Sequence, residues 1–156
     1  MKFLRHGPIG NEKPGCIDSD GNIRDLSAVI ADFTPETVTC DALAALAERD
    51  LSDLPIIDPA TRIGPCVGAT RNFYAVGLNY ARHARETNNP EPKEPVLFSK
   101  STSSICGPND PIILPRGSVK TDWEVELGII IGRPCSYVGK DEALDYVAGF
   151  CIFFFF

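Results

Sequence analysis

Short apolar stretches separated by polar turns run along most of the chain, and few segments have apolar residues at helical spacing. Strands are predicted where such stretches are rich in β-branched or aromatic residues and bounded by turn residues. They are residues 3–5, 15–17, 23–26, 73–78, 96–100, 111–114 and 124–131. Helices are predicted at 40–49, 80–87 and 140–148, and Thr34-Pro35 has the composition of a helix start. Because strands predominate, the pattern predicts an α+β fold.

Residues 124–131 form the longest predicted strand. Its second half, 127–131, is apolar on both faces, which is typical of a strand buried on both sides. The helix at 140–148 is expected to end at Gly149.

Prolines and glycines mark a domain boundary before the middle of the chain. Pro55, Pro59, Gly64 and Pro65 punctuate a connector. We therefore expect a small N-terminal module at 1–65, followed by part of a second domain at 66–156.

Composition excludes several classes of protein. Apolar residues make up 44% and charged residues 23%, as in a globular protein. The net charge of −6 disfavours nucleic acid as a partner. The six cysteines form no Cys-x-x-Cys pair, so reduced cysteines of a cytoplasmic protein are predicted rather than disulfides. No apolar leader is present and no run is long enough to span a bilayer, so no membrane partner is expected.

Glu124 and Glu126 are the first candidate chemistry. Residues two apart on a strand point to the same face, so the two carboxylates project side by side. A hard cation such as Mg²⁺ or Mn²⁺ would relieve their repulsion and would take their oxygens as ligands. The alternative is a solvated strand end whose carboxylates only face water, and the spacing alone does not decide between the two.

A histidine and a lysine are further candidates. His83 and Glu86 lie three apart on the predicted helix 80–87, where the carboxylate could orient the imidazole as a general base. The alternative, which the pattern alone favours, is a surface ion pair on a helix that also carries Arg82 and Arg85. Lys100 closes an apolar strand and could stabilise an oxyanion or enolate, or could simply extend to solvent.

Four motifs occur in order along the chain. They are 77–83 (Gly-Leu-Asn-Tyr-Ala-Arg-His), 94–100 (Glu-Pro-Val-Leu-Phe-Ser-Lys), 107–112 (Gly-Pro-Asn-Asp-Pro-Ile) and 122–127 (Asp-Trp-Glu-Val-Glu-Leu). Together they closely resemble the fumarylacetoacetate hydrolase family, over residues 70–152. The part before residue 65 resembles, more weakly, the leading module of a bacterial branch that includes ureidoglycolate lyases and hydroxyheptadienedioate isomerases.

The resemblance implies a fold, a reaction and a set of site residues. The fold would be a mixed β-sheet rolled into a barrel-like shape, incomplete here and preceded by the N-terminal module. The reaction would be Mg²⁺- or Mn²⁺-dependent cleavage of a C–C bond in a small 2-oxo or 1,3-diketo acid, with decarboxylation, isomerisation and hydration as variants. Glu124 and Glu126 match metal ligands, His83 the base that activates water, Glu86 its orienting partner, and Lys100 a stabiliser of negative charge. A homodimer is implied for the full-length protein.

The chain departs from the family near residue 155. The family's third metal carboxylate is an Asp shortly after the helix at 140–148, and Phe155 stands where it is expected, within four consecutive phenylalanines at 153–156. We interpret this as a C-terminally truncated or frame-shifted member. A catalytically inactive fragment is therefore the alternative to an active enzyme.

Overall fold

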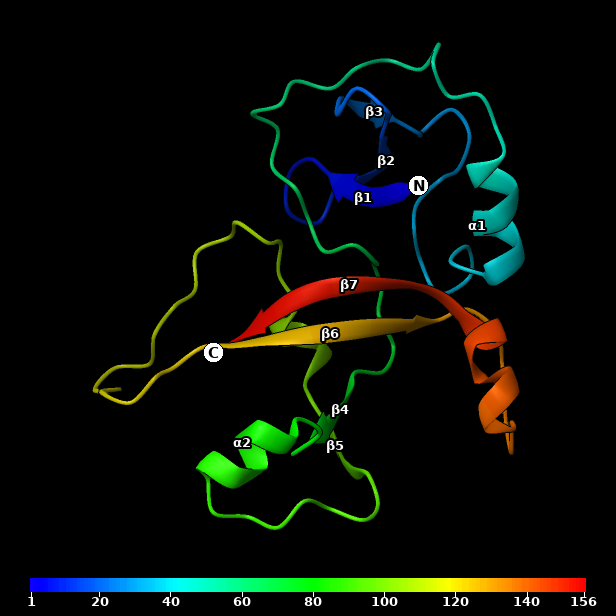
Figure 1. Cartoon of the computed structure of the whole chain (residues 1–156). Coiled ribbons are helices and arrows are strands. Elements are labelled where there is room, and N and C mark those ends of the chain that lie inside the picture. The colour runs from blue at the N-terminus through cyan, green and yellow to red at the C-terminus, as the bar shows by residue number, and fades with distance from the viewer. The chain divides into compact units, whose positions relative to one another are not determined.

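A computed structural model describes residues 1–156, which form three separate antiparallel sheets joined by short helices and loops (Figure 1). The chain divides into two compact units. The first comprises Met1–Ala69 together with Cys106–Phe156, and the second comprises Thr70–Ile105. Each unit is described by itself below.

The N-terminal sheet of the first unit contains β1 (Lys2–His6), β2 (Lys13–Ile17) and β3 (Ile23–Asp25) in that order. The three strands confirm the prediction from apolar spacing. The Asp18 carboxylate accepts hydrogen bonds from the backbone N–H groups of Asp20 and Asn22 at 3.0 and 2.8 Å. An Asx turn of this kind reverses the chain between β2 and β3.

A small core packs against this sheet. Its most buried members are Cys16, Leu26, Phe33, Val38, Leu46 and Leu51. Helix α1 (Cys40–Ala47) contributes Leu46 and begins after Thr39, whose side chain accepts a hydrogen bond from the Ala42 N–H at 3.1 Å. The start predicted at Thr34 is wrong. Thr34 instead opens a turn, in which its carbonyl accepts from the Val38 N–H at 2.8 Å.

Strands β6 (Glu124–Ile131) and β7 (Val147–Phe155) form a two-stranded antiparallel ladder and lie side by side along its length (Figure 1). The limits of β6 are those predicted. The prediction that β6 is buried on both faces is wrong, because Leu127 and Ile129 are 57% and 54% exposed. A short 3₁₀ helix, η2 (Lys140–Tyr146), precedes β7, so the predicted helix ends early and Gly149 lies inside a strand. With nine residues, β7 is also longer than β6.

The second unit is a hairpin-like pair of strands with a helix between them. Strand β4 (Tyr74–Gly77) pairs antiparallel with β5 (Val96–Ser99), and α2 (Ala81–Glu86) lies in the connection. A single 3₁₀ turn, η1 (Thr102–Ser104), follows β5. These elements confirm the strands and the helix predicted for this part of the chain.

One predicted strand is absent from the structure. Residues 111–114 form no strand, since Pro111 and Pro115 remove backbone donors at both ends. The domain boundary predicted near residue 65 stays a prediction; by contacts, residues 1–69 and 106–156 form one unit. All strand pairs are antiparallel within three open sheets, so the mixed, rolled sheet stays a prediction. None of the helices has the length and apolarity needed to cross a bilayer.

Candidate functional site

The two candidate metal carboxylates lie at the first and third residues of β6. Glu124 is exposed and Glu126 is half-buried. Antiparallel pairing sets Glu124 opposite Phe155 and Glu126 opposite Phe153. Side chains that pair directly across a ladder leave it on the same face, so both carboxylates share this face with both phenyl rings.

The rings of Phe153 and Phe155 contact each other edge to face, with centroids 5.1 Å apart. They occupy the β7 positions from which a further side chain could reach toward the carboxylates. The same face is tightly packed farther along, because a Cβ at Gly128 would lie 2.3 Å from the Phe153 ring. Aromatic carbon thus borders Glu124 and Glu126 where additional oxygen ligands would otherwise be placed.

Glu124 and Glu126 are the type of ligand that a hard cation prefers, but two carboxylates are too few to make a complete site. Carboxylate oxygens are suitable ligands for Mg²⁺ or Mn²⁺. However, no group of three or more His, Cys, Asp or Glu side chains in this chain is arranged to hold a metal ion. Glu124 and Glu126 alone therefore make an incomplete site.

The candidate base lies in the second unit, on α2. His83 is exposed on this helix, and Glu86 is exposed one turn later. The Glu86 carboxylate accepts a hydrogen bond from Arg82 Nε at 2.9 Å, and no hydrogen bond joins it to His83. Glu86 therefore forms a surface ion pair with Arg82, as the alternative interpretation of this helix expects. The pair forms because the two residues are four apart and lie on the same side of the helix.

Lys100 follows β5 in the same unit and is half-buried. Its Nζ lies 5.7 Å from the centroid of the Phe98 ring, and its backbone N–H donates to the Phe73 carbonyl at 2.8 Å. The ammonium group is thus placed over an aromatic face, which is a favourable position for a cation. The roles of His83, Glu86 and Lys100 stay predictions.

Sequence reasoning missed a network of ion pairs in the first unit. Arg62 donates to both oxygens of Asp110, from Nε at 2.7 Å and from Nη2 at 2.6 Å, and it also donates to Glu12 at 2.9 Å. Arg5 makes a similar forked pair with Asp32, at 2.7 and 2.8 Å. Forked arginine–carboxylate pairs are strong and directional, so Arg62 ties Asp110 of the 107–112 segment to Glu12, the residue before β2.

The network shifts the ionisation of its members. The hydrogen bonds from Arg62 hold the pKa of Asp110 below its usual value, and they are helped by the Gly107 N–H. Burial alone would raise the pKa of Glu12, but its hydrogen bond with Arg62 leaves that pKa lowered. Asp110 lies within the 107–112 motif, which could have indicated it, whereas nothing in the sequence singles out Arg62.

Two cysteines far apart in the sequence also interact. Cys66 accepts a hydrogen bond from the Cys151 thiol, which lowers the pKa of Cys66 to about 7. The same contact, together with burial, raises the pKa of Cys151. All six cysteines are free thiols in the structure. A thiol with a lowered pKa is the more nucleophilic member of such a pair near neutral pH.

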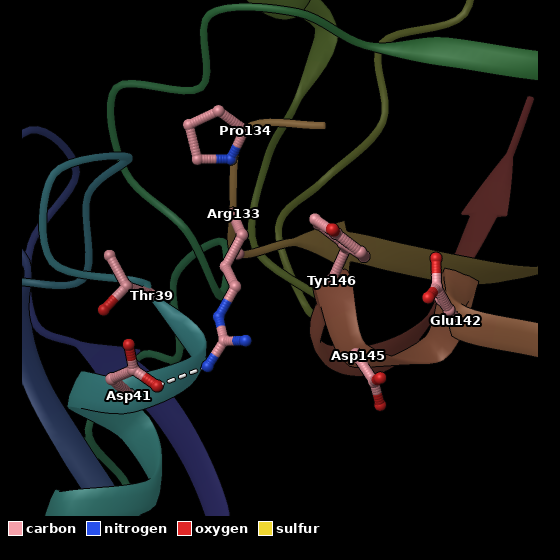
Figure 2. A pocket seen from close by; sticks show the side chains of 8 residues that line it. Thr39, Asp41, Arg133, Pro134, Glu142, Asp145 and Tyr146 are labelled. Carbon is pink, nitrogen blue, oxygen red and sulfur yellow. Dashed lines mark hydrogen bonds and ion pairs between the residues drawn. The ribbon is translucent and has the colours of Figure 1, made fainter. Parts of the chain in front are cut away.

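A cavity of about 570 Å³ opens between α1 and η2, within the first unit. Figure 2 shows Arg133 paired with Asp41 across it, with Glu142 and Asp145 at the η2 side. Its walls are completed by Thr39, Gly132, Pro134 and Tyr146. None of the five predicted site residues lines it, so this cavity is separate from the candidate site.

Residues 72–154 match the family model described as "Fumarylacetoacetate (FAA) hydrolase C-terminal". The chain belongs to the fumarylacetoacetate hydrolase family. The match covers more than half of the chain and includes all five predicted site residues.

Known proteins of the family resemble the chain over almost its whole length. A Burkholderia multivorans (strain ATCC 17616 / 249) protein named "Putative hydrolase" is 57% identical over 152 residues, which are 97% of this chain and 54% of that protein. The fumarylacetoacetate hydrolase of the psychrophilic Exiguobacterium antarcticum matches with a TM-score of 0.71 at 29% identity, over 97% of this chain and 54% of that chain. A maleylpyruvate hydrolase from Sphingobium sp. SYK-6 matches with a TM-score of 0.76 at 25% identity, over 99% of this chain and 58% of that chain. The chain therefore spans about half the length of the relatives it matches.

Proposed function

We propose that this chain is part of a metal-dependent hydrolase or lyase that cleaves a C–C bond in a small 2-oxo or 1,3-diketo acid. The observation that carries the proposal is the pair of carboxylates, Glu124 and Glu126, on one face of β6 within the part that matches the family. The names of relatives, a fumarylacetoacetate hydrolase and a maleylpyruvate hydrolase, support an oxo-acid substrate. Isomerisation and decarboxylation are variants of the same chemistry.

The proposed roles follow from the chemistry of each side chain. Glu124 and Glu126 contribute part of the ligand set for Mg²⁺ or Mn²⁺, which supplies a Lewis acid to this class of reaction. His83 takes a proton from the attacking water, and its exposure leaves the ring free to accept it. Lys100 places a positive charge near developing negative charge. Glu86 orients His83 only if it leaves its present partner, Arg82.

A chimaera tests the proposal. Residues 1–152 of this chain, which end before the four phenylalanines, replace the corresponding part of the Burkholderia multivorans protein, and cleavage of an acylpyruvate is followed with Mg²⁺ or Mn²⁺ present. We expect His83→Gln to lower kcat by about 100-fold or more, as expected for loss of a general base. Arg85→Gln, two residues later on the same helix, is the matched control and should retain most activity, because Arg85 pairs with Glu91 and not with Glu86. Full activity of His83→Gln would contradict the role of His83.

The second candidate is a catalytically inactive fragment. It is favoured by one observation, the absence of any arrangement of three metal-binding side chains in this chain. Calorimetric titration of the chain with Mn²⁺ separates the two candidates. If no heat of binding appears at millimolar metal, the chain by itself is the inactive fragment.

A further inference from the structure

Cys66 and Cys151 bring two thiols from distant parts of the sequence into contact within the first unit. The Cys151 thiol donates a hydrogen bond to the Cys66 sulfur, so the two sulfur atoms are direct neighbours. Neither residue belongs to the candidate site. Both are free thiols, so the pair is reduced in this structure.

The loop that carries Cys66 is held in place on both sides of this residue. On one side, the Gly64 N–H donates a hydrogen bond to the Arg5 carbonyl at 2.8 Å. On the other side, the Gly68 N–H donates to the Phe33 carbonyl, also at 2.8 Å. Because Arg5 lies in β1, these bonds tie the loop to the N-terminal sheet.

The Cys151 sulfur is positioned by the β6–β7 ladder. Cys151 lies within β7 and pairs directly with Gly128 of β6. A Cβ at Gly128 would lie 2.6 Å from the Cys151 sulfur, so this sulfur lies over a position that only glycine leaves open. Both sulfur atoms are therefore carried by backbone that the fold already holds, and little rearrangement is needed to bring them to the S–S distance of about 2.0 Å.

The surroundings of the two thiols differ, and they make Cys66 the more reactive one. Cys66 is exposed, whereas Cys151 is half-buried. Besides the Cys151 thiol, the Val67 N–H donates a hydrogen bond to the Cys66 sulfur, and the positive charge of Arg5 also favours a thiolate there. The contact with Cys66 and burial both raise the pKa of Cys151. Since the thiolate is the nucleophile, Cys66 is suited to react first and Cys151 second.

We propose that Cys66 and Cys151 form a reversible disulfide when the chain is exposed to a hydroperoxide such as hydrogen peroxide. The Cys66 thiolate attacks one peroxide oxygen, the O–O bond breaks and hydroxide leaves, which converts Cys66 to a sulfenic acid. The Cys151 sulfur then attacks the Cys66 sulfur. The S–S bond forms, the S–O bond breaks, and the thiol proton leaves with the hydroxyl group as water. Two thiols lose two electrons in all, and the peroxide is reduced to two molecules of water.

The disulfide joins the loop on the N-terminal sheet to β7. It closes a long stretch of chain, so it restricts the unfolded state and should stabilise the folded unit. A dithiol reductant reverses it by thiol–disulfide exchange. The inference goes beyond the proposed reaction and does not depend on it, because neither cysteine has a role in that reaction.

The test oxidises the full chain, kept dilute, with an equimolar amount of hydrogen peroxide at neutral pH. Remaining thiols are blocked with N-ethylmaleimide, and the unreduced peptides are mapped by mass spectrometry. We expect one linked peptide pair, containing Cys66 and Cys151, in a chain that shows no intermolecular crosslink. Cys66 should oxidise roughly fivefold faster than the exposed Cys135. Dithiothreitol should restore all six free thiols, and the oxidised chain should unfold at a higher denaturant concentration than the reduced chain.

The variant Cys151→Ser separates the two steps. A serine hydroxyl keeps a hydrogen-bond donor beside Cys66 but cannot form a disulfide. The sulfenic acid on Cys66 should therefore persist and be captured by dimedone, whereas the unaltered chain should give little of this adduct. Cys135→Ser is the matched control, since it removes an exposed thiol and should still form the disulfide of Cys66 with Cys151.

Oxidation in guanidinium chloride shows whether the fold selects the pair, and the unfolded chain should give several different disulfides. The proposal is overturned if the folded chain forms another pairing or an intermolecular disulfide. It is also overturned if Cys66 and Cys135 oxidise at equal rates, or if dimedone captures no more sulfenic acid in Cys151→Ser than in the unaltered chain.

Discussion

Phe155 lies directly across the β6–β7 ladder from Glu124, and both side chains leave the sheet on the same face. Paired residues on one face of an antiparallel sheet have Cβ atoms about 5 Å apart. A carboxylate at position 155 would therefore lie within reach of a cation held by Glu124 and Glu126 in the proposed site. The position that the family resemblance identifies for a third metal ligand is thus, in this register, next to the first.

We expect Phe155→Asp to strengthen Mn²⁺ binding by about tenfold or more, because a third carboxylate adds both a ligand and a charge. Phe154→Asp is the matched control, since Phe154 pairs with Val125 on the opposite face. Titration calorimetry of the unaltered chain and both variants measures the effect. If the two variants bind Mn²⁺ equally, residues 124, 126 and 155 do not form a metal site on their shared face.

The carboxylate pair itself can be tested by charge removal. In the Phe155→Asp background, Glu126→Gln should return Mn²⁺ affinity to that of the unaltered chain or below it, since the ligand set again has only two carboxylates. Glu142→Gln, on the exposed surface of η2, should leave the affinity unchanged. Binding that survives Glu126→Gln would place the metal elsewhere on the chain.

The sequence predicted β6 with correct limits because the alternation of Glu124, Val125 and Glu126 and the apolar run after them are local signals. Its exposure could not be predicted, because burial depends on which layers pack against the ladder. The predicted helix extends to residue 148 because residues 140–148 have helical composition. In the structure β7 begins at Val147, where pairing with β6 outweighs the local helical preference. Contacts such as Arg62 with Asp110 join residues far apart in sequence, and no spacing rule reports them.

The N-terminal core should depend strongly on Phe33. This side chain is 1% exposed, and its ring lies 5.3 Å from that of Phe3. Phe33→Ala should lower the free energy of unfolding by about 3–5 kcal/mol, because it removes apolar contacts and leaves a cavity. Chemical denaturation followed by circular dichroism measures the loss. The exposed Phe150 is the control, since Phe150→Ala opens no cavity and should cost less than half as much.

The ion pair of Arg62 with Asp110 predicts a pH dependence of stability. The pKa of Asp110 is lowered below its usual 3.8 in the folded chain. A lowered folded-state pKa contributes stability above the unfolded value, and that contribution is lost as the pH falls through the folded value. We therefore expect Asp110→Asn to flatten the loss of stability between about pH 5 and pH 2. Asp53→Asn, which removes an exposed carboxylate, should leave the slope unchanged.

The contact of Cys66 with Cys151 predicts selective reactivity. The pKa of Cys66 is lowered to about 7 by the hydrogen bond from Cys151, so the thiolate that reacts with iodoacetamide forms near neutral pH. The alkylation rate of Cys66, followed by peptide mass spectrometry, should be half-maximal near pH 7. In Cys151→Ala the donor is gone, and the midpoint should move upward toward the ordinary thiol value of 9.0. Cys106→Ala, which removes an exposed thiol, should leave the profile of Cys66 in place, and an unchanged midpoint in Cys151→Ala would show that Cys151 does not set it.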